Sequence, residues 1–113
     1  MGNVTTLKCK GETDVKNLAG AISHEMAKGK HVEIVYIGAG AGQQAVKAFI
    51  IASGWAAQQA RCLVMKAGFR QVKIEERDMS AIVLRVFEAH TAEIISAEPV
   101  LDKDIDKHLE ATP

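Results

Sequence analysis

The chain has 113 residues, 48% of them hydrophobic and 25% charged, with a formal net charge of zero. This length suits one domain with a single core, and the balanced charge excludes a strongly basic, histone-like protein while leaving room for a local basic face. No apolar run reaches the roughly 18 residues that a membrane helix needs, and the first residues lack the charged-then-apolar pattern of a signal peptide. We therefore expect a cytoplasmic protein.

The first half of the chain predicts a strand, a helix and a second strand. A β-branched run predicts a strand over Val4–Cys9. Thr13 or Asp14 can cap the helix that follows, and Gly29 is positioned to end it. A nearly continuous apolar run over Val32–Ile37 is typical of a central strand. The helix between these two strands is predicted from one apolar stripe, which comprises Val15, Leu18, Ala19, Ile22 and Met26.

The second half predicts one more helix and a pair of strands. The helix is expected from about residue 41 to residue 53, with Gly54 ending or bending it. A third strand is expected over Cys62–Ile74, with Ala67-Gly68 as a bulge or bend. After a polar turn over residues 75–79, alternating apolar residues predict a fourth strand over Ala81–Glu88.

This β-α-β-α-β-β order predicts an α+β fold, a two-layer sandwich of a small mixed sheet and two helices whose last two strands form an antiparallel hairpin. We expect this domain to occupy residues 1–90 and an acidic C-terminal extension to occupy residues 91–113. In the extension, Leu101, Ile105 and Leu109 fit either one short amphipathic helix or a loosely ordered tail.

The charges are distributed unevenly along the chain. Residues 91–113 carry six acids and two lysines, a net charge of −4, so residues 1–90 carry +4. Between Glu33 and Glu75 there is no acid, although five basic residues lie there. Burial would explain a stretch without charged residues of either sign, but it does not explain why five basic residues remain in this one. The pattern therefore predicts an anion-facing surface, over which the acidic extension could lie in competition with nucleic acid.

A glycine-rich segment, Gly38-Ala39-Gly40-Ala41-Gly42, lies between the second strand and the second helix. Such a segment either brings backbone N–H groups close to a phosphate or allows a tight turn with close helix packing. It lacks the third glycine of a dinucleotide-binding fingerprint and the Gly-Lys pair of a Walker loop. Both general interpretations remain open.

The sequence gives no sign of catalysis, metal or cofactor binding. The four histidines and two cysteines show no metal-ligand spacing, and we expect the thiols to be buried and reduced. No nucleophile, acid and base can be grouped, so the protein is not expected to be an enzyme. Aromatic residues make up 4% of the chain, which argues against sequence-specific RNA recognition by stacking.

Two blocks of the sequence resemble a known family. "EIVYIGAGAGQQAVKAFIIASG" (Glu33–Gly54) and "FRQVKIEERDMSAIVLRVFE" (Phe69–Glu88) resemble the stage V sporulation protein S family, over about residues 4–89. That family is similar to the Alba superfamily of small, dimeric nucleic-acid-binding proteins with the same element order. The resemblance implies a regulatory protein of sporulation or development.

The resemblance also implies where DNA or RNA would be contacted: the loops before each helix and the arm formed by the last hairpin. Glycines occupy loop positions where archaeal Alba proteins carry arginines, so weak, sequence-independent and salt-sensitive binding is implied. The expected nucleic-acid-binding residues are Lys8, Lys10, Gly38, Gly40, Gly42, Gln43, Gln44, Lys47, Lys66, Arg70, Lys73 and Arg77.

The sequence also fits two other functions. The neutral net charge and the missing loop cations also fit a homodimeric or larger protein–protein interaction module that binds no nucleic acid. The glycine-rich segment also fits a site for a small phosphate ligand.

Overall fold

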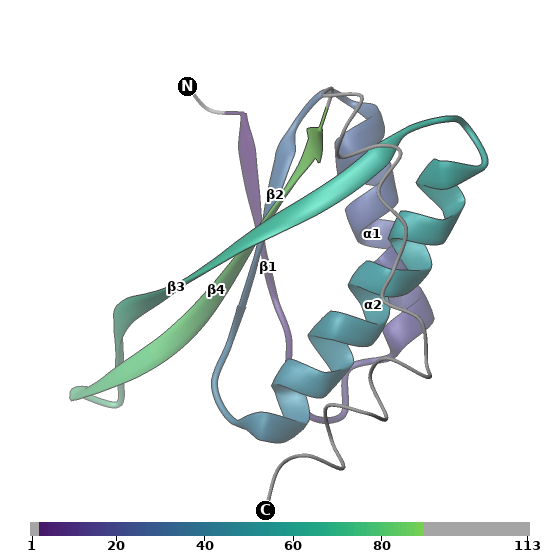
Figure 1. The fold of residues 1–113 in the computed structure, drawn as a ribbon. Coiled ribbons are helices and arrows are strands. Elements are labelled where there is room, and N and C mark those ends of the chain that lie inside the picture. The colour runs from purple at the N-terminus through teal and green to yellow at the C-terminus, as the bar shows by residue number, and fades with distance from the viewer. Residues whose placement is uncertain (1–2, 90–113) are drawn as a thin grey trace, which may run out of the picture.

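Two helices cover one face of a four-stranded mixed sheet in the computed structural model, which describes residues 3–89 (Figure 1). This confirms the predicted α+β fold and element order. The predicted extension over residues 91–113 lies outside the described residues. Among residues 3–89, no helix is long and apolar enough to cross a membrane. The elements are β1 (Val4–Lys8), α1 (Val15–Ala27), β2 (His31–Tyr36), α2 (Ala39–Ala57), β3 (Cys62–Ile74) and β4 (Arg77–Ala89).

The strands lie in the order β1-β2-β4-β3. β1 and β2 are parallel and are joined through α1, as expected for a helical crossover. β4 pairs antiparallel with both β2 and β3. β4, the last strand of the described residues, is therefore inserted between β2 and β3, and β3 lies at the edge of the sheet.

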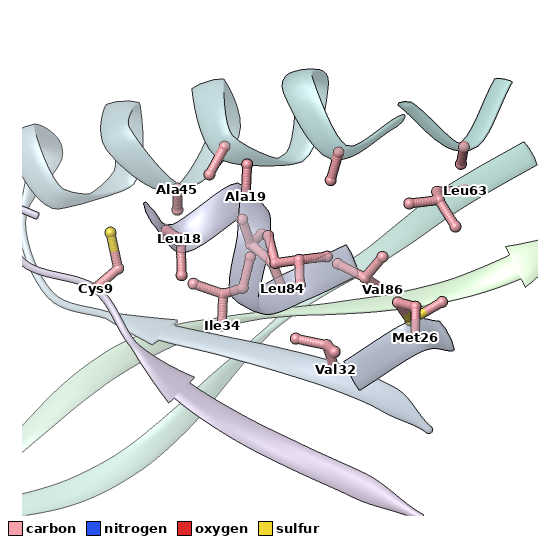
Figure 2. Close-up of a cluster of buried hydrophobic side chains, with 14 residues drawn as sticks. Cys9, Leu18, Ala19, Met26, Val32, Ile34, Ala45, Leu63, Leu84 and Val86 are labelled. Atoms are coloured by element: carbon pink, nitrogen blue, oxygen red, sulfur yellow. The ribbon is translucent and has the colours of Figure 1, made fainter. Parts of the chain in front are cut away.

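The core lies between the sheet and the helices (Figure 2). Alternation in β2 and β4 directs one set of apolar side chains towards the helices, and these meet the predicted stripe of α1. The buried positions of α2 are all alanine or glycine, so α2 can approach α1 closely. The largest fully buried side chains are Ile22, Val32, Ile34 and Val86.

Residues 70–81 form an arm, because β2 pairs with β4 only from Ile82 onwards while the β3–β4 ladder continues to Ile74 and Arg77. The expected polar turn over residues 75–79 is wrong: only Glu75 and Glu76 form the turn, with φ angles of 50° and 66°. Polar residues fit the arm's strands because most arm side chains are exposed. The expected bulge at Gly68 is also absent, since the pairing of β3 with β4 is unbroken.

The observed ends of α1 agree with those predicted from the sequence, whereas the observed ends of α2 differ from the prediction. Asp14 caps α1 by accepting a hydrogen bond from the Asn17 backbone N–H at 2.9 Å, and Gly29 follows the helix with a φ of 82°. α2 begins earlier than expected because Gly38, with a φ of 93°, serves as its N-cap. It continues past Gly54 to Ala57, because Ala56 is still buried in the core.

Candidate functional site

Three lysines from two distant parts of the sequence line one cleft at the end of the sheet. Lys8 and Lys10 come from the end of β1 and the loop that follows, and Lys73 comes from the arm. The cleft has a volume of about 400 Å³, and no acidic residue is among the residues that line it. Its remaining walls come from the segment after β1, from the end of β2 with Ile37, and from the arm. We refer to this feature as the lysine cleft. It is a cationic hollow open to solvent, and it suits an anion that can be contacted from several sides.

A buried carboxylate holds two arginines on the sheet face that is turned away from the helices, which we call the open face. Arg70 donates from Nη1 to Glu33 Oε1 at 3.1 Å and from Nη2 to Oε2 at 3.0 Å. Arg85 Nη2 donates to the same Oε2, and Thr6 Oγ1 donates to Oε1 at 3.3 Å. Glu33 is only 4% exposed. The hydrogen bonds from Arg70 and Arg85 outweigh burial and lower the pKa of Glu33 to about 2.

This network changes the interpretation of Arg70. The residue lies at the base of the arm, as expected, but its guanidinium reaches across β4 to a carboxylate on β2. Its pairing with Glu33 raises the pKa of Arg70, and the side chain remains 44% exposed. Arg70 therefore fixes the arm to the body of the sheet, and its remaining N–H donors are accessible to a ligand.

The glycine-rich segment packs closely against its neighbours at Gly42. A Cβ on Gly42 would lie 2.6 Å from Cε1 of Tyr36, whereas one on Gly40 would lie at an ordinary contact distance of 4.0 Å from the Cα of Gly11. Close packing therefore explains the glycine at position 42, and the positive φ of Gly38 explains the one at position 38.

The remaining predicted residues are scattered. Gln44 donates from Nε2 to the Thr13 carbonyl at 2.8 Å and so ties α2 to the loop after β1. Gln43 lines a separate hollow beside Tyr36, and Lys47 is exposed on α2. Lys66 lies on β3 beside Arg85, and Arg77 begins β4 at the end of the arm. The structure thus brings together Lys8, Lys10 and Lys73, while Lys66 and Arg70 belong to the open face.

Sequence reasoning missed Glu33 and Arg85 as members of a site. A usable signal existed for Glu33: it is a lone acid within the apolar run of a central strand, and a buried acid requires hydrogen-bonding partners. No signal in the sequence identifies those partners, which lie 37 and 52 residues away.

The other reactive groups of the described chain are not assembled into a site. The Cys9 thiol is buried, donates to the Ala41 carbonyl at 3.3 Å, and has a pKa raised by that burial. Cys62 is a free thiol at the start of β3. Within residues 3–89, no three side chains of histidine, cysteine, aspartate or glutamate come together as metal ligands would.

The comparison with protein families agrees with the resemblance of the two sequence blocks. The family model described as stage V sporulation protein S matches residues 5–89, which includes both described helices and nearly all of the described sheet. The match covers well over half of the chain and contains the lysine cleft and the open face. By this match, the chain is a small sporulation-related protein that belongs to the stage V sporulation protein S family.

Proposed function

We propose that this protein binds DNA or RNA through the sugar-phosphate backbone, as a regulatory homodimer, with the lysine cleft as a principal contact site. The observation that carries the proposal is that Lys8, Lys10 and Lys73 line one cleft that no acidic residue lines. Lysine ammonium groups contact phosphates as point charges and do not read base sequence. The proposed role is therefore sequence-independent binding rather than catalysis.

The number of lysines in the cleft determines how strongly the protein is expected to bind nucleic acid. Three lysines per chain can neutralise only about three phosphates, so binding should be weak and should fall steeply as salt is added. A dimer would double the number of contacts and compensate for the small number in each chain.

An apolar patch supports the dimer. Val46 and Ile50 on α2 are 37% and 60% exposed, and Met65 and Phe69 on β3 are 36% and 81% exposed. Val46 lines the same hollow as Ile82, and Ile82 is the cross-strand partner of Phe69, so the patch extends from α2 onto the hairpin. A phenylalanine exposed to this extent, beside other exposed apolar side chains, is typical of a surface covered by a partner.

Replacing Lys8, Lys10 and Lys73 together by glutamine is expected to weaken binding of a 20-base-pair duplex about a hundredfold at low salt. The slope of log affinity against log salt should fall by about 0.9 for each lost phosphate contact. Fluorescence anisotropy of the labelled duplex at several salt concentrations measures both quantities. The control is Lys16→Gln with Lys28→Gln, which removes two cations, one in α1 and one at its C-cap, on the other layer of the fold. An equal loss per lysine removed in both sets would show that overall charge, rather than the cleft, governs binding.

Replacing Ile50 by glutamate is expected to convert the dimer to a monomer, because it places a charge in the centre of a desolvated interface. Sedimentation-equilibrium analysis at micromolar concentration measures the mass. Lys47→Glu, one turn earlier on α2 and also exposed, is the control for an added negative charge outside the apolar patch. A wild-type chain that sediments as a monomer would contradict the dimer.

A further inference from the structure

The open face of the sheet is strongly basic, although the chain as a whole is neutral. The pairing of the strands places every second residue of each strand on this face, and Thr6, Glu33, Arg85 and Lys66 form one row across all four strands. No described helix lies against the open face (Figure 1). By the same register, Glu33 is the one acid on the described strands of this face. Its cations are Lys8, Lys66, Arg70, Arg77 and Arg85.

Glu33 holds two of these cations in fixed positions without covering them. The carboxylate accepts both Nη groups of Arg70 and one of Arg85, while the two arginine side chains remain 44% and 47% exposed. Guanidinium groups that are fixed in this way lose little conformational entropy when an anion binds to their other N–H donors.

Lys66 adds a charge that the fold does not neutralise. It lies directly opposite Arg85 in the ladder between β3 and β4, and like charges at opposed positions are destabilising. Among residues 3–89, Lys66 has no ion-pair partner. The set of Glu33, Arg70, Arg85 and Lys66 has three cations and one carboxylate, a net charge of +2. A bound phosphate would relieve the repulsion that the sheet imposes.

Two rings lie beside this basic row. His31 and Phe87 each lie two residues from a member of the row, and their ring centroids are 6.2 Å apart with a tilt of 51°. His31 is exposed and Phe87 is half-buried. A sheet surface that combines cations with aromatic rings suits unpaired bases, which can stack on a ring while the backbone lies over the charges. A duplex keeps its bases stacked on each other and does not present them in this way.

We infer that the open face binds single-stranded nucleic acid, with a backbone phosphate held by Lys66, Arg85 and Arg70 and a neighbouring base against the His31–Phe87 pair. This inference rests on the proposed function and adds to it a second surface, which shares only Lys8 among its cations with the lysine cleft and has a preference for unpaired strands. Glu33 is a positioning residue for the two arginines.

The test measures anisotropy of a labelled 20-nucleotide oligothymidylate and of a labelled duplex with the full chain and its variants. Lys66→Gln is expected to weaken oligothymidylate binding about fivefold at low salt and to lower the salt slope by about 0.7. Phe87→Leu is expected to weaken oligothymidylate binding about fivefold and to leave duplex binding unchanged. Lys16→Gln, on α1, is the control. Thermal unfolding separates binding from stability, since Lys66→Gln removes a like-charge pair and should not lower the melting temperature.

Each outcome decides the inference. Weaker oligothymidylate binding by both Lys66→Gln and Phe87→Leu, with the control unchanged, supports it. Wild-type affinity in either of these two variants overturns it. If a chain with Lys10→Gln and Lys73→Gln, two cleft lysines that are not on the open face, is weakened in the same assay, the proposed function stands. A wild-type chain that binds neither probe at low salt overturns both.

Discussion

Replacing Glu33 by glutamine is expected to lower the free energy of unfolding by about 2 kcal/mol at pH 7, which corresponds to about 10 °C in melting temperature for a domain of this size. The carboxylate accepts hydrogen bonds from Arg70, Arg85 and Thr6, and a carboxamide presents an N–H₂ group to two guanidinium groups that can only donate. This expected loss of stability is smaller than the pKa shift of Glu33 alone implies, because both guanidinium groups are partly exposed and are screened by solvent.

The same network predicts a pH dependence with a definite sign. The pKa of Glu33 is lowered from 4.5 to about 2 in the folded protein, so the folded state binds this proton less readily than the unfolded state. The stabilisation is therefore fully present above about pH 4.5 and is lost as the pH falls towards 2. Urea unfolding of the wild-type and Glu33→Gln chains at pH 7 and pH 3 should show a stability difference that shrinks at the lower pH.

The control for these measurements is Glu12→Gln, which removes an exposed carboxylate from the loop after β1. It should leave both the stability and its pH dependence nearly unchanged, as is usual for surface substitutions. If the Glu33→Gln and wild-type chains differed by the same amount at both pH values, the carboxylate would not be the titrating group.

Replacing Gly42 by alanine is expected to cost about 1–3 kcal/mol of stability, although alanine normally favours a helix. The new Cβ would lie 2.6 Å from Cε1 and 2.9 Å from Cζ of Tyr36, so the ring or α2 must move. The effect should be much smaller in a chain that also carries Tyr36→Ala, because the colliding ring is then gone. Urea unfolding of the two single variants and the double variant gives the coupling between the positions.

Gly54 in the same helix is the matched control for that substitution. A Cβ at Gly54 has no neighbouring atom within 4 Å, and the residue is exposed within α2. Gly54→Ala is therefore expected to stabilise the chain by up to about 1 kcal/mol. Destabilisation by the same amount at both positions would mean that flexibility in α2, rather than contact with Tyr36, is what the glycines provide.

Much of the fold could be predicted from local patterns. The apolar stripe of α1, the β-branched run of β1 and the alternation in β4 each depend on residues only a few positions apart, and a period of 3.6 or 2 fixes which side chains face the core. The caps of α1 were also readable, since Asp14 and Gly29 act on the nearest turn of the helix. These features determined the α+β class and the element order.

Predictions failed where tertiary packing overrides a local preference. Gly54 suggested a helix end, but Ala52 and Ala56 on either side of it are buried in the core, and α2 continues until that contact ends. The polar residues at the start of β4 suggested a turn, but they pair with β3 in the exposed arm, where polar side chains need no core. Neither outcome can be inferred from the neighbouring residues alone.

The sequence by itself determined which side chains alternate on each strand and that a long stretch of the chain lacks acids. Only the tertiary structure decided which of the basic residues meet. β4 lies between β2 and β3, and this insertion brings Glu33, Arg70 and Arg85 together from three strands and places Lys73 in one cleft with Lys8 and Lys10. The physical reason is that pairing between distant strands is set by the burial of their apolar faces against the helices, and the positions of the charges on the opposite face follow from that register.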